Sequence, residues 1–134
     1  MALATDVFDA DQRAVMATFR EAHEAYSVAL SALLGESTPQ LGDPIGDDLR
    51  SKFSADLKTV LDGAYTAEST AVATHTEIIG ELQGLEGASL LASILIVEAA
   101  NGTVIADLNN ITTLDELLVV PEADALTPLE RQTP

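Results

Sequence analysis

The fold is decided by residues 88–109, which read ASLLASILIVEAANGTVIADLN. Core-type positions recur there at steps of three and four residues, the spacing of one helix face: Leu91, Ile94, Glu98, Asn101, Ile105 and Leu108. Two of these six positions are polar. A carboxylate and an amide on an apolar stripe lose their hydration when the helix packs, so they need partners inside the protein. The stretch predicts a core helix that carries polar side chains into a bundle.

Two further helices are predicted upstream by the same spacing. The first covers about 11–34, with Asp9 or Asp11 as its N-cap and Gly35 as its end. Its stripe is Val15, Phe19, Ala22, Tyr26, Ala29 and Leu33. The second covers about 54–83, with the stripe Leu57, Leu61, Ala64, Glu68, Ala71, His75, Ile78 and Leu82. A loop rich in proline and glycine separates them, because residues 35–48 hold two prolines and three glycines.

These elements predict an all-α protein, an antiparallel helical bundle with three long helices. The bundle is expected over residues 1–108 and a tail over 109–134. A capping box at Thr113 and Glu116 predicts a short helix over 113–118 in that tail, ahead of Pro121. A closed four-helix bundle needs one more long helix, so the fourth is expected to be missing or to come from a partner.

The charge balance excludes several classes of partner. There are 22 acidic and six basic residues, a net charge of −16, so no cationic face for nucleic acid can be assembled. Insertion into a membrane is not expected, because the apolar run 88–100 is too short to span a bilayer. Cysteine is absent, which excludes disulfides and thiolate metal sites. No signal peptide is recognisable at the start of the sequence.

Two glutamates are the most informative polar residues. Glu68 and Glu98 lie on the apolar stripes of successive helices, where each carboxylate must be paired, protonated or bound to a cation. A multivalent metal ion would resolve their mutual repulsion. His75 follows Glu68 by two helical turns, about 10 Å, so we expect it at a helix interface with its own hydrogen-bond partner.

The third predicted helix resembles a known family. Residues 94–101, ILIVEAAN, are similar to the last core helix of ferritin-like di-iron proteins, where a Glu-x-x-His motif is found. Residues 67–75, AESTAVATH, resemble the preceding helix, and residues 19–26, FREAHEAY, the one before. The branch is that of bacterial ferritin-like domain proteins, many of them exported. The resemblance implies a di-iron or manganese centre with Glu68 and Glu98 as ligands and His23 as a third, and a place in the cell envelope.

The sequence departs from that family at its ligands. Asn101 stands where the motif has histidine, and neither Arg20 with His23 nor His23 with Tyr26 makes a Glu-x-x-His pair. Asn101 and Tyr26 are therefore expected as polar core residues, together with His75.

No catalytic residue is identified, and two functions follow. In the preferred one, the chain is a non-catalytic accessory or interaction subunit without a cofactor. In the alternative, it binds iron or manganese, as an oxidase or a metal binder, with ligands completed by another chain. A homodimer or a larger protein complex is expected in either case.

Overall fold

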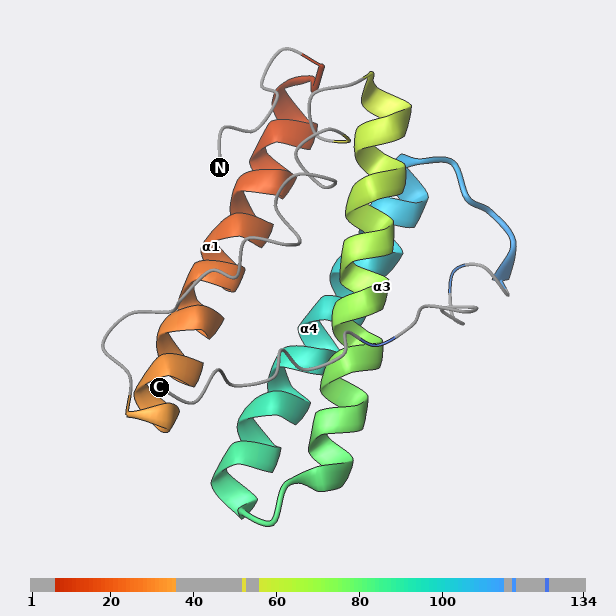
Figure 1. Cartoon of the computed structure of the whole chain (residues 1–134). Helices are drawn as coiled ribbons and strands as arrows, with labels where there is room; N and C mark the ends of the chain where they lie inside the picture. Colours follow the sequence, from red (N-terminus) through yellow and green to blue (C-terminus); the bar gives the residue numbers. More distant parts are fainter. Residues whose placement is uncertain (1–6, 36–51, 53–55, 115–116, 118–124, 126–134) are drawn as a thin grey trace.

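The computed structural model describes residues 7–35, 52, 56–114, 117 and 125, and within them the protein is all helical (Figure 1). The three long helices are α1 (Ala10–Leu34), α3 (Leu57–Glu81) and α4 (Leu85–Leu108). The described residues contain no strand. The predicted fold class, an all-α helical bundle with three long helices, is confirmed.

Helix α1 begins one residue earlier than predicted, and Asp9 rather than Asp11 is its N-cap. The Asp9 carboxylate accepts from the Gln12 N–H at 2.8 Å, and the Asp9 N–H donates to Gln12 Oε1 at 3.0 Å. This capping box satisfies two backbone groups that the helix leaves without internal partners. The helix ends as predicted at Gly35, whose φ of 71° is the left-handed conformation that favours glycine.

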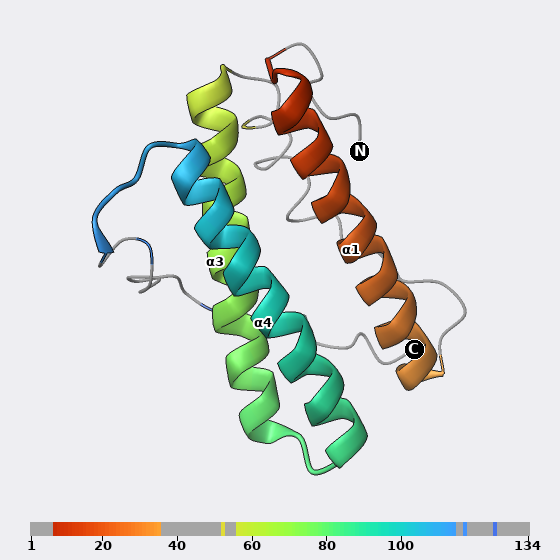
Figure 2. The same ribbon diagram turned by 180° about the vertical axis from the view of Figure 1, so that it is seen from behind.

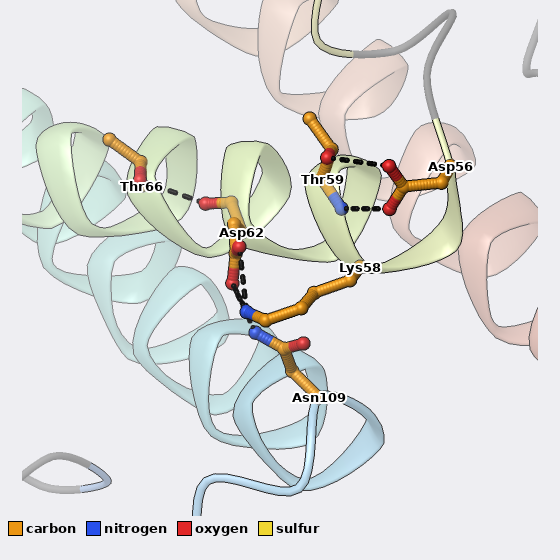
Figure 3. A network of polar contacts seen from close by, with 6 residues as sticks. All are labelled: Asp56, Lys58, Thr59, Asp62, Thr66 and Asn109. Atoms are coloured by element: carbon orange, nitrogen blue, oxygen red, sulfur yellow. Dashed lines mark hydrogen bonds and ion pairs between the residues drawn. The ribbon is translucent and has the colours of Figure 1, made fainter.

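Helix α3 begins at Leu57, three residues later than predicted. Its N-cap is Asp56, which accepts from the Thr59 N–H and the Thr59 hydroxyl at 3.0 and 3.1 Å (Figure 3). These bonds lower the pKa of Asp56 below its usual value. An aspartate in this position defines a helix start, so the predicted start at Ser54 was wrong. The helix also ends two residues early, at Glu81, because Leu82 is extended.

Helix α4 begins at Leu85, three residues before the predicted start, and ends at Leu108, one residue before the predicted end. The predicted helices, which cover 54–83 and 88–109, leave residues 84–87 between them as a connection. Gly87 is instead a buried helical residue, where an added Cβ would lie 3.5 Å from side-chain atoms of Leu33 and Leu82. These are ordinary contact distances, so Gly87 packs against both leucines as a helical residue, and the connection to α3 shortens to Leu82–Gly84.

The three helices run along one another with α4 antiparallel to both α1 and α3 (Figures 1 and 2). Helices α3 and α4 pack along their length, and α1 packs against α4 less extensively. Asn109, at the end of α4, donates from Nδ2 to Asp62 of α3 at 2.6 Å (Figure 3). The end of α1 and the start of α3 lie at opposite ends of the molecule.

The apolar core lies where the start of α1, the start of α3 and the end of α4 meet. Its buried members are Phe8, Met16, Val60, Leu61, Ala64 and Ile105. On α1 the predicted stripe is only half-buried, and Leu33 is 46% exposed. The first helix therefore contributes less to the core than its spacing suggested.

The tail falls mostly outside the described residues. Of the predicted helix 113–118, only residues 113, 114 and 117 are described. The Leu117 N–H donates to the Thr113 carbonyl at 3.1 Å, which is the spacing of a helical turn. The short helix and the division at residue 108 stay predictions.

Helix α4 is long and apolar enough to cross a membrane by length and composition alone. Its 18-residue window has a mean hydropathy of 1.7, and 33% of that window is buried inside the protein. The core helix of a soluble protein passes the same test, so this property alone does not assign a membrane span.

Candidate functional site

The six polar residues that the sequence singled out are drawn together between the three helices. Helix α1 supplies His23 and Tyr26, α3 supplies Glu68 and His75, and α4 supplies Glu98 and Asn101. Glu68, Glu98 and Asn101 are 7%, 2% and 6% exposed, so all three are buried as their places on the stripes predicted.

One part of this cluster centres on Glu68. Its Oε1 accepts from His23 Nε2 at 3.0 Å and from the Asn101 amide at 3.4 Å. His23 also contacts Tyr26 edge to face, with ring centroids 5.8 Å apart. One carboxylate oxygen thus ties α1, α3 and α4 together, and Asn101 is a polar core contact to Glu68, as predicted.

The other part is the pair formed by Glu98 and His75. His75 Nδ1 lies 2.7 Å from Glu98 Oε2, and their side chains are 18% and 3% exposed. The ring N–H donates to the carboxylate, which has only acceptors when it is ionised. His75 was predicted to have a hydrogen-bond partner, and the structure identifies that partner as Glu98.

Both side chains from α1 have raised pKa values. The hydrogen bond from His23 to Glu68 raises the pKa of His23 above 6.5; burial opposes this rise, and the negative charges of Glu68 and Glu98 add to it. Burial raises the pKa of Tyr26 above its usual value, with a further contribution from the same two glutamates. The cluster therefore favours a protonated His23 and a neutral Tyr26.

A pocket of about 250 Å³ lies between α3 and α4 beside these glutamates. Glu68, Glu98 and Ser69 line it together with apolar residues that include Val72 and Leu117. Two enclosed atoms of its lining residues, Glu68 Oε2 and Ser69 Oγ, have no hydrogen-bond partner. Such atoms are costly to bury, so this side of Glu68 is where the polar core is incomplete.

Comparison with known protein families supports the helical fold. The model of a protein family described as "Ferritin-like domain" matches residues 1–110. The chain belongs to the ferritin-like family. No curated protein and no solved structure matches it.

The residues that the structure describes do not form the di-metal centre that is typical of ferritin-like proteins. Such a centre takes four glutamates and two histidines from four helices. Among the residues that the structure describes, no three histidine, aspartate or glutamate side chains are grouped closely enough to hold a metal ion. The three candidate ligands have separate partners instead: His23 pairs with Glu68, and Glu98 pairs with His75.

Ser69 is the buried polar residue beside Glu68 that sequence reasoning missed. It follows Glu68 directly and is 5% exposed, although it lies off the predicted stripe of α3. Small polar residues occur on either face of a helix, so its spacing carried no signal. Only the packing of α4 against α3 shows that it borders the pocket.

Proposed function

We propose that this ferritin-like protein is non-catalytic and acts as an accessory or interaction subunit, with the metal site of its family reduced to a polar core. The main observation that supports this proposal is that Glu68 and Glu98, both buried, each have a histidine as a hydrogen-bond partner. A carboxylate that is already paired needs no cation to offset its burial.

Asn101 supports the same proposal. At the place of the family's histidine it donates an amide hydrogen to Glu68. An amide donor directed at a carboxylate stabilises a network without metal, whereas a metal site would need an electron pair at that position.

The direct test is elemental analysis of protein from its native source, followed by anaerobic reconstitution with iron or manganese. We expect less than stoichiometric metal and no metal-dependent consumption of oxygen. Stoichiometric metal together with oxygen consumption would overturn the proposal.

The second candidate is an iron- or manganese-binding protein whose ligands are completed by another chain. The observation that favours it is Glu68 Oε2, an enclosed carboxylate oxygen without a partner. Its test uses a double variant that combines Glu68→Gln and Glu98→Gln. The control is a second double variant, Glu77→Gln and Glu81→Gln, whose residues are exposed near the end of α3. If this candidate is correct, metal content and melting temperature fall only in the first variant. Unchanged values would eliminate it.

A further inference from the structure

The side of α4 that faces away from the other helices carries no charge over most of its length. Between Gly87 and Ala106 the only ionisable residue is Glu98, which is buried. The exposed positions of this stretch include Ser89, Ser93, Ile96, Ala100, Thr103 and Val104. We call these six residues the outer face of α4; two of them, Ala100 and Thr103, also border the pocket beside Glu68. Figure 2 shows the molecule from the side on which α4 lies in front of α3.

The two largest side chains of the outer face, Ile96 and Val104, are both apolar. Ile96 is 68% exposed and Val104 is 40% exposed. Single exposed apolar residues are ordinary, but two on one uncharged helical face, separated by small residues, form a surface that water solvates poorly. The other residues of the face include the small side chains of Ser89, Ser93 and Ala100, which would let another helix approach closely.

Exposed apolar side chains also occur elsewhere, for example Leu34, Leu82 and Leu85, but α1 and α3 carry charges that the outer face of α4 lacks. The chain carries a net charge of −16, and exposed acids lie on both other helices, for example Glu21 and Glu24 on α1 and Glu77 and Glu81 on α3. A basic partner would be attracted to those acidic surfaces and gain nothing from an uncharged one. A second copy, with the same charge of −16, is repelled wherever carboxylates face each other. The outer face of α4 is where two copies can meet without opposed charges.

We infer that two copies of this chain form a homodimer through the outer face of α4, with the two α4 helices antiparallel. A two-fold symmetric contact places the same surface on both sides of the interface. Ile96 lies at the middle of the 24-residue helix, so in such a dimer it would lie at the symmetry axis. The acids at the helix ends, Glu86 and Asp107, would then lie at the rim of the interface.

A lipid surface is the competing occupant, because α4 meets the length and hydropathy of a membrane helix. Helices that lie on membranes usually carry lysine or arginine along their polar side. Here Glu86 and Asp107 border the outer face, and the net charge of −16 opposes binding to anionic lipids. The charges therefore favour a second copy.

The inference rests on the interaction role proposed above and names its partner, but it does not depend on whether the buried pairs bind metal. Metal content tests the proposed function, and oligomeric state tests the homodimer, so either can fail without the other.

The first experiment is sedimentation velocity of the full chain at micromolar concentration, with two variants that add the same charge. We expect the wild type at twice the 14.0 kDa chain mass. Ile96→Lys should raise the dissociation constant of the dimer by about tenfold or more, because a lysine at the axis faces its own copy. Ala25→Lys, on the exposed side of α1, should leave the dimer intact. A monomeric wild type, or equal dissociation constants for the two variants, would overturn the inference.

The absence of cysteine allows a second test that keeps the wild-type fold and charge. Ile96→Cys at the symmetry axis should form a disulfide with its own copy under mild oxidation, whereas Ala25→Cys should stay uncrosslinked. Failure of Ile96→Cys to crosslink faster than Ala25→Cys would count against the antiparallel contact. Flotation of the wild type with zwitterionic vesicles as a monomer would assign the face to lipid instead.

Discussion

His75 Nδ1 lies 2.7 Å from Glu98 Oε2 and is the hydrogen-bond partner of a side chain that belongs to a residue only 2% exposed. Because His75 lies two helical turns beyond Glu68 on α3, the sequence predicted that it would have its own hydrogen-bond partner. The partner comes from α4. Gly102 lies beside Glu68 and Asn109 beside Asp62, so the antiparallel register brings Glu98 level with the part of α3 between Glu68 and His75.

Removing His75 should be costly because it leaves Glu98 buried without its donor. We expect His75→Ala to lower the free energy of unfolding by about 2–3 kcal/mol. Glu98→Gln should cost less, because the glutamine carbonyl still accepts from the ring. Urea unfolding of both variants measures the difference. A loss for His75→Ala no larger than that for Glu98→Gln would show that the pair adds little.

A double-mutant cycle isolates the same pair. If the loss in His75→Ala comes from an uncompensated carboxylate, adding Glu98→Gln should recover part of it, so the double variant loses less than the sum of the single ones. Additive losses would instead assign the effect of His75→Ala to lost packing.

The stability should depend on pH through His23. Its pKa in the folded protein is raised above 6.5, chiefly by the hydrogen bond to Glu68, so the folded state binds the proton more tightly than the unfolded state does. This contribution is complete below pH 6.5 and is lost as the pH rises through the folded-state pKa. Because the His23 side chain is 44% exposed, solvent screens part of the effect.

Two measurements check the role of His23. Proton NMR of its ring should give a titration midpoint above 6.5. The variant His23→Gln keeps a donor for Glu68 but does not titrate, so its melting temperature should change less than that of the wild type between pH 6 and pH 8. Parallel pH profiles for the two proteins would contradict the prediction.

The N-terminal cap of α1 should contribute measurably to stability. Asp9→Ala removes the acceptor for the Gln12 N–H and the capping box with it, so we expect a loss of about 1 kcal/mol. The matched control is Asp11→Ala, in the first turn of the same helix, which removes an acid of equal charge that is not the cap. Thermal unfolding should separate the two variants. Equal losses would mean that charge near the helix start, and not the cap, stabilises α1.

Much of the fold follows from spacing alone, because a stripe at steps of three and four is a property of one helix. The positions of Glu68, Glu98 and Asn101 in the core could be predicted on that basis. The start of α4 could not, since Gly84 and Gly87 are identical residues with different surroundings: Gly87 is buried beside Leu33 and Leu82. The partners of the two histidines depend on how three helices meet, which spacing within one helix does not specify.

Gly102 gives the sharpest contrast between the sequence and the structure. In sequence, a glycine inside a predicted helix indicates a close approach of two backbones or a kink. A Cβ added at Gly102 would meet Glu68 Cβ at 3.8 Å, an ordinary contact. Gly102→Ala should therefore raise the free energy of unfolding by about 0.5–1 kcal/mol, through the better helix propensity of alanine. Gly63→Ala is the control, because its Cβ would lie 3.1 Å from Lys52 Cβ and should offset that gain. Urea unfolding measures both, and a destabilised Gly102→Ala would show that Glu68 cannot tolerate the added methyl group.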